Sequence, residues 1–143
     1  MANSDRLVGT NLYVHFIHAG GTAVLSGDYT NFTVTRDSQM ADMTAGDDGG
    51  QYNKYLYQIN NATLEAYSDG TVSAASIGSA MVRGTEGTLE YGPNGTASGS
   101  PKGSFPAVVK KGDITMPYDN GTTLSIEFAG QGAEIDNPSV DTW

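Results

Sequence analysis

The sequence predicts a mainly β fold, an antiparallel β-sandwich or partial barrel with one short flanking α-helix and long loops. Two observations lead to this prediction. Short runs of β-branched and aromatic residues recur between turn residues along the 143-residue chain. The 19 glycines and a charged fraction of only 16% are unusual for a helical protein. The length fits one domain, so we expect residues 1–143 to form a single β domain.

The first half of the chain contains the first predicted strands. Asn11 to His18 is rich in β-branched and aromatic residues, and Thr22 to Ser26 is placed to pair with it across a Gly-Gly turn. Asn31 to Arg36 alternates apolar residues with threonines. From Asp37 to Gln51 this alternation is lost, which predicts a long acidic loop. Tyr52 to Tyr67 predicts two strands, or one long strand that bends where two asparagines adjoin.

The second half contains the predicted helix and a hairpin. Small residues with apolar side chains at helical spacing predict a helix from Ser73 to Ala80. A short strand is expected from Gly84 to Tyr91, followed by a long Gly/Pro/Ser loop from Gly92 to Pro106. Ala107 to Tyr118 and Thr122 to Gly130 are predicted to pair, because the Asp-Asn-Gly sequence between them favours a tight turn.

Several kinds of chemistry find no support in the sequence. The absence of cysteine excludes disulfides and thiol catalysis. His15 and His18, the two histidines, are an odd number of residues apart on a predicted strand and therefore lie on opposite faces, which argues against a shared metal. No nucleotide-binding or serine-nucleophile motif is present. We therefore expect no cofactor, no metal and no enzymatic activity.

Charge and hydropathy restrict the partners. The formal net charge is −9, which argues against tight nucleic-acid binding, because phosphate recognition depends on clustered Lys and Arg. No run of eighteen apolar residues occurs, and the first residues do not resemble a secretion signal. We therefore expect neither a membrane span nor secretion by a signal peptide.

Two stretches of the chain resemble the major tail proteins, or tail tube proteins, of tailed phages. The first runs from Asp37 to Asp69 and contains Thr-Ala-Gly-Asp-Asp, a Tyr-rich segment and a strand that ends in Tyr-Ser-Asp. The second runs from Gly84 to Ala133 and contains Gly-Thr-Glu-Gly-Thr-Leu, the Gly/Pro loop, Pro-Ala-Val-Val, Pro-Tyr-Asp and a closing Gly-Gln-Gly-Ala. The order and spacing of these pieces carry the resemblance, which covers residues 25 to 133.

The resemblance implies a structural protein of the virion. Such a subunit would be made in the host cytoplasm and assemble with itself into stacked, hexameric rings, contact other tail proteins, and leave a hollow conduit through which DNA passes without specific binding. Six copies would carry six times the formal charge of −9, and a channel lined with carboxylates repels the DNA backbone. The candidate lumen-facing carboxylates are those on polar strand faces, namely Glu65, Glu90 and Glu127.

Charge placement suggests a contact between subunits. Residues 37 to 48 contain four acids and no base, whereas residues 102 to 111 contain three lysines and no acid. We predict that these segments meet between neighbouring copies, in a heterologous contact of the kind that propagates rings and filaments. The residues are Asp37, Asp42, Asp47 and Asp48 on one side and Lys102, Lys110 and Lys111 on the other.

Two other interpretations also fit the sequence. The chain could be another virion part, such as a tail terminator, a head-tail connector or a capsid decoration protein. It could also be a carbohydrate-binding or adhesin module, which would need an exposed aromatic platform. Tyr52, Tyr55, Tyr57 and Tyr67 are the residues available for such a platform.

Overall fold

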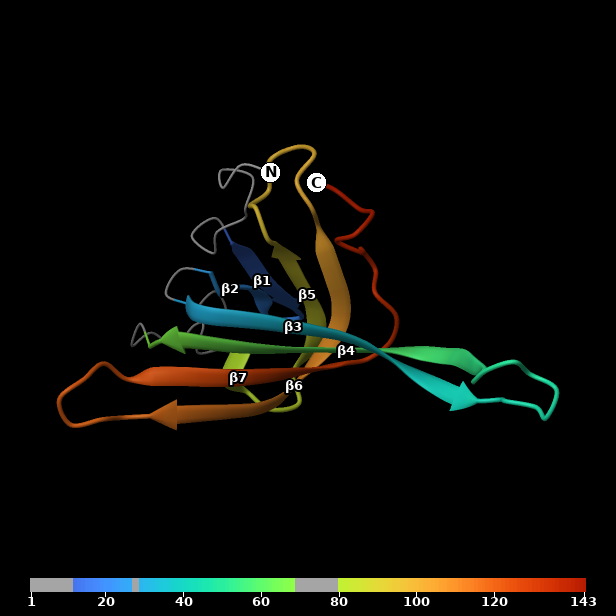
Figure 1. Ribbon diagram of the computed structural model, residues 1–143. Coiled ribbons are helices and arrows are strands. Elements are labelled where there is room, and N and C mark those ends of the chain that lie inside the picture. The colour runs from blue at the N-terminus through green and yellow to red at the C-terminus, as the bar shows by residue number, and fades with distance from the viewer. Residues whose placement is uncertain (1–11, 27–28, 69–79) are drawn as a thin grey trace, which may run out of the picture.

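The protein is built from one antiparallel β-sheet (Figure 1). The computed structural model describes residues 12–26, 29–68 and 80–143. Seven strands follow the order β2-β1-β5-β6-β7-β4-β3 across the sheet, and every neighbouring pair is antiparallel. The strands are β1 (Tyr13–His18), β2 (Gly21–Val24), β3 (Tyr29–Asp42), β4 (Asn53–Tyr67), β5 (Glu86–Gly92), β6 (Gly103–Thr115) and β7 (Thr123–Gly130).

The core lies on one face of this sheet, because the sheet bends round it. Leu124, Ile126 and Phe128 alternate along β7 as buried residues, as the sequence predicts. Phe16 on β1 lies against Phe128, with ring centroids 5.1 Å apart, although β5 and β6 separate β1 from β7 in the sheet. The two halves of the sheet therefore enclose a common core, as in a sandwich. The prediction of a mainly β, sandwich-like fold is confirmed.

Strand β6 forms the corner between the two halves. Its first part pairs with β5, from Gly103 to Val108, and its later part pairs with β7 as far as Thr115. A register shift between Val109 and Lys111 marks a β-bulge at the point where the partner changes. Bulges of this kind bend a strand and let one strand serve two sheet halves.

Two predicted loops are shorter than the sequence suggested. The expected loop from Asp37 begins instead as the end of β3, which continues to Asp42 and pairs with β4. This prediction was wrong because both faces of this part of β3 meet solvent, so no alternation of apolar residues is required. The expected loop from Gly92 to Pro106 ends early, since β6 already begins at Gly103.

The segment after β7, residues 131–143, is called the strap below. It runs back across the beginning of β6, where the Ile135 N–H donates to the Ser104 carbonyl at 2.9 Å and the Trp143 N–H donates to the Ser100 carbonyl at 3.0 Å. The strap covers Ser104, which is only 2% exposed although it lies on the sheet face opposite the core. This cover explains why consecutive residues at the start of β6 are all buried.

The predicted helix from Ser73 to Ala80 falls almost wholly on residues 69–79, outside the described residues. Within the described part of the chain, no helix has the length and apolar character needed to cross a membrane.

Candidate functional site

The outer side of one half of the sheet carries a continuous polar surface. On β3, β4, β7 and the later part of β6, the residues that alternate with core positions are mostly Thr, Ser, Asn, Glu, Asp or Lys. The strand register aligns them in rows, because Thr63 lies between Thr33 and Glu127, and Glu127 lies beside Lys111. We call this surface the polar face. Its members are Asn31, Thr33, Thr35, Asn61, Thr63, Glu65, Lys110, Lys111, Asp113, Thr115, Thr123, Ser125 and Glu127.

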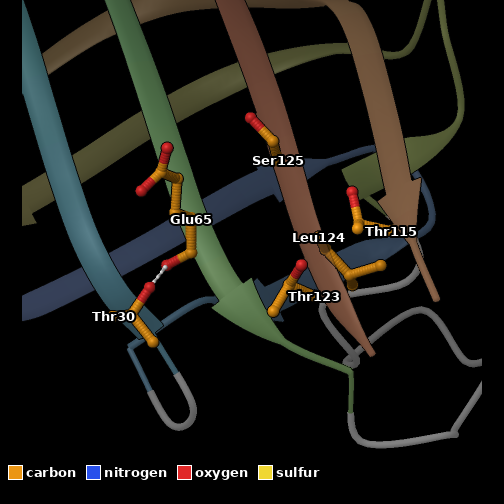
Figure 2. Close-up of a pocket in the computed structure, with 6 residues that line it drawn as sticks. All are labelled: Thr30, Glu65, Thr115, Thr123, Leu124 and Ser125. Carbon is orange, nitrogen blue, oxygen red and sulfur yellow. Dashed lines mark hydrogen bonds between the residues drawn. The ribbon is translucent and has the colours of Figure 1, made fainter. Parts of the chain in front are cut away.

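A shallow depression on the polar face shows its chemistry (Figure 2). Four strands contribute to it, through Thr30, Glu65, Thr115 and the β7 residues Thr123 and Ser125. The Thr30 hydroxyl donates to the Glu65 main-chain carbonyl at 3.2 Å. Small-molecule sites are usually enclosed and largely apolar. This depression is open, and its lining combines four hydroxyl side chains with Glu65 and Leu124, so it is not an enclosed apolar pocket.

The four strands of the polar face end in two open edges. Strand β3 is the last strand of the sheet and has no described neighbour on its outer side. Strand β6 is covered by β5 only as far as Val108, and Val109 still bonds to Gly84 and Thr85. From Lys110 to Thr115, no described strand pairs with β6 on that side. Exposed edges of this kind are templates for pairing with another chain.

A two-stranded arm projects from the body at the far end of β3 and β4 (Figure 1). We define the arm as residues 38–57. Strand β4 loses its second neighbour here, because its pairing with β7 ends at Asn61. Six large apolar side chains of the arm are between 47% and 57% exposed. Such apolar exposure on a protruding ribbon is typical of an interaction surface. The residues are Met40, Met43, Tyr52, Tyr55, Leu56 and Tyr57.

Comparison with solved structures gives the architecture a precedent. No protein-family model and no curated protein matches the sequence. A chain of the SPP1 tail tube superimposes with a TM-score of 0.72 at 10% identity, covering 96% of this chain and 82% of that one. The chain has the fold of a tail tube protein. A chain from the tail of an empty gene transfer agent (GTA) particle, refined with C6 symmetry, gives a TM-score of 0.67 at 10% identity.

The second tail tube match covers nearly the whole of both chains. It spans 92% of this chain and 99% of the GTA tail chain. A chain of the native GTA virion covers the same shares, with a TM-score of 0.67 and 11% identity. The tail tube fold therefore accounts for the described sheet as a whole, and not for an isolated hairpin.

The structure brings together two of the three carboxylates predicted to face a channel. Glu65 on β4 and Glu127 on β7 are both members of the polar face, in adjacent cross-strand rows. Glu90 lies elsewhere, on β5, opposite His15 in the register with β1. Burial raises the pKa of Tyr13 and lowers the pKa of His15. The Glu90 charge adds to the first shift and only partly offsets the second. Glu90 therefore belongs to a separate aromatic cluster.

That cluster occupies the outer face of β1. Tyr13 stacks on His15 with ring centroids 4.0 Å apart, its hydroxyl lies 3.0 Å from His15 Nδ1, and the edge of Trp143 packs against it at 5.0 Å. His18 instead stacks on the core residue Phe16 at 5.6 Å. The two histidines thus point to opposite faces, as predicted. Among the described residues, no group of three His, Cys, Asp or Glu side chains could hold a metal ion.

The four acids of the predicted contact lie on the outer part of β3 and in the arm loop. Asp37 continues the outward positions of Thr33 and Thr35 on β3. Asp42 accepts bonds from the Thr44 N–H at 3.0 Å and from its hydroxyl, and these bonds lower the pKa of Asp42. Asp48 accepts from the Ala45 N–H at 2.7 Å. Asp42 and Asp48 therefore also stabilise the loop of the arm.

The three lysines have different surroundings. Lys102 Nζ lies 3.6 Å from Asp136 Oδ2 of the strap and over the ring of Trp143, so Lys102 already has partners within its own chain. Lys111 lies 3.1 Å from Asp113, but both side chains are more than half exposed, and such pairs contribute little to stability. Lys110 is exposed and lines a second depression of the polar face beside Glu127.

The tyrosines of the suggested carbohydrate platform do not form one surface. Tyr52, Tyr55 and Tyr57 belong to the arm, whereas Tyr67 is the last residue of β4 at the other end of the strand. Ten residues of extended strand separate Tyr57 from Tyr67, which is about 33 Å at the usual rise. A sugar ring cannot contact both.

Sequence reasoning missed the strap and the residue that receives it. Arg36 on β3 binds Glu134 through two hydrogen bonds of 2.9 and 3.1 Å, and it also contacts Asn137 and Ser139. Glu134 is nearly buried, with a side chain 9% exposed. The scarcity of bases was the available signal, since an arginine within a threonine-rich strand stands out among only seven basic residues.

Proposed function

We propose that the chain is a tail tube subunit, which assembles with copies of itself into stacked, hexameric rings that form a hollow conduit for DNA in a phage-like tail. The observation that carries this proposal is the polar face, a four-stranded surface with an edge on each side that no other described strand covers. The similarity of the fold to a chain from a GTA tail computed with C6 symmetry supports the hexameric ring.

The two open edges give a route to ring closure. If the edge of β3 in one copy pairs with residues 110–115 of β6 in the next, the unpaired backbone groups of both edges gain partners. Six copies then contribute about 24 strands, which at about 4.8 Å per strand give a circumference of at least about 115 Å and a backbone diameter of at least about 37 Å, since strand tilt widens a barrel. Such a channel admits a nucleic-acid duplex.

The chemistry of the polar face suits the inner wall of this channel. It presents hydroxyl and amide groups together with Glu65, Asp113 and Glu127, and the bases there are Lys110 and Lys111. Phosphate binding requires clustered cations, so a wall with more carboxylates than amines lets DNA slide. In this arrangement Glu65 and Glu127 face the lumen. Glu90 lies outside the polar face and would have no place in that wall.

Charge fixes which edges pair. Lys111 shares a cross-strand row with Thr33, and Asp37 lies four residues further along β3. Ring closure with a shift of about four residues along the strands would therefore bring Asp37 to the lysines at the β6 edge. This contact keeps Asp37, Lys110 and Lys111 from the predicted acid-to-lysine interaction. Lys102 is left out, because it pairs with Asp136 of the strap. Asp42, Asp47 and Asp48 on the arm would then contact the next ring, together with the exposed tyrosines and methionines.

Electron microscopy of the purified protein tests the proposal. We expect negatively stained samples at high concentration to contain long hollow tubes. Isolated rings would indicate a terminator, connector or decoration protein instead, because these parts do not propagate. Monomers at every concentration and salt would contradict self-assembly.

A further inference from the structure

At the base of the arm the sheet narrows to two strands. Beyond Asn61, β4 has only β3 as a neighbour, since its pairing with β7 ends there. Two-stranded ribbons twist easily and are marginally stable alone. The direction of the arm therefore depends on whatever else holds the residues at its base.

The strap binds both strands at this point. From β3, Arg36 donates two hydrogen bonds to the Glu134 carboxylate, at 2.9 and 3.1 Å, and one to Asn137 Oδ1 at 2.7 Å. From β4, the Gln58 side-chain oxygen accepts from the Glu134 N–H at 2.9 Å, and Asn60 donates to the Gly132 carbonyl at 3.3 Å. Two-point pairing of a guanidinium with a carboxylate restricts orientation as well as distance.

The other part of the strap is anchored on the body. Asp136 accepts a hydrogen bond from the Ser104 hydroxyl at 2.8 Å and lies 3.6 Å from Lys102. The Ile135 N–H and the Lys102 N–H bond to the Ser104 and Asp141 carbonyls. The strap thus joins the start of β6 to the base of the arm, two places that are not adjacent in the sheet.

We propose that Arg36 and Glu134 form a clamp through which the strap fixes the direction in which the arm leaves the body. We further infer that the clamp, by fixing the arm, holds it in the orientation that docks on a second copy. This second step rests on the proposed function. Arg36 is thus a positioning residue, because it acts through the strap and not through direct contact with the partner.

The arm direction can be measured directly, because the chain contains no cysteine. Nitroxide labels are attached at Asp47→Cys in the arm loop and at Thr22→Cys on β2, and the distance distribution is recorded by pulsed electron paramagnetic resonance in dilute, monomeric protein. We expect Arg36→Gln and Glu134→Gln each to broaden this distribution about twofold, since the two-stranded base is then free to twist.

Lys102→Gln is the matched control, because it also removes an ion pair of the strap, but one that lies on the body. We expect it to leave the distribution as narrow as in the parent protein. Amide exchange at Ile135 reports the other side of the clamp, and we expect it to be about tenfold faster in Arg36→Gln, as for the loss of a charge-assisted hydrogen bond. A single cooperative melting transition confirms that the core remains folded.

The outcomes separate the clamp from the proposed function. An unchanged distance distribution in Arg36→Gln overturns the clamp, whether or not the strap exchanges faster. Equal broadening by Lys102→Gln also overturns it, since the effect would then belong to the strap as a whole. Broadening without a rise in the critical concentration for tubes overturns the presetting step. If the parent protein makes no tubes, the tail tube proposal fails while the distance data still decide the clamp.

Discussion

The exposed tyrosines of the arm give the sharpest test of how copies contact one another. Tyr55 and Tyr57 are 51% and 57% exposed in the single chain. A tyrosine buries about 200 Å² when fully covered, so docking of the arm would remove roughly 100 Å² of each side chain from water. At about 25 cal/mol per Å², this burial is an upper limit of about 2.5 kcal/mol for each residue.

Part of this free energy is lost in ordering the interface, so we expect each single change to alanine to weaken the contact by about 1 to 2.5 kcal/mol. The critical concentration for tube formation should then rise roughly fivefold to seventyfold in Tyr55→Ala and in Tyr57→Ala. The assay is sedimentation of tubes over a concentration series, with the soluble protein measured after each spin.

Tyr67→Ala provides a matched control, because Tyr67 is 49% exposed but lies at the other end of β4, away from the arm. We expect it to polymerise near the parent concentration. If both arm variants also polymerise at the parent concentration while remaining folded, the arm does not contact the next copy. An equal rise in all three variants would point to altered folding and not to docking.

Two further predictions concern the edges and the wall of the proposed tube. Replacing Lys110 and Lys111 by Glu should stop polymerisation while the monomer stays folded. Adding Asp37→Lys to this variant should restore tubes, as seen by electron microscopy. Failure of that rescue would refute the β3–β6 contact. Glu65→Lys should leave tube formation intact, but tubes of this variant that are assembled with duplex DNA should retain the DNA at low salt. Tubes of the control variant Asp119→Lys, changed in the β6–β7 turn, should release the DNA. Equal retention by both would place Glu65 outside the lumen.

Sequence reasoning worked where one face of a strand meets the core. Leu124, Ile126 and Phe128 alternate with polar residues, and the structure buries all three. The same rule selected Glu65 and Glu127 as residues on polar strand faces. The rule failed from Asp37 to Asp42, where the strand continues into the arm with solvent on both sides and therefore has no reason to alternate.

The strap was invisible to sequence reasoning for a different reason. Its main ion pair joins Arg36 to Glu134, residues 98 positions apart, and no local pattern encodes such a contact. The same segment explains why the sequence did not predict the start of β6. Gly103 and Ser104 resemble part of a Gly/Ser loop in the sequence. In the structure the Tyr91 ring packs over Gly103, and the strap covers Ser104 and bonds to its backbone.

The charges at the open edges also bear on why such a chain would form rings and not random aggregates. Pairing of β3 with β3 would bring Asp37 of one copy near Asp37 of another, and pairing of β6 with β6 would bring the lysines at positions 110 and 111 together. The β3–β6 combination can place Asp37 near these lysines, and it is the heterologous one that closes a ring.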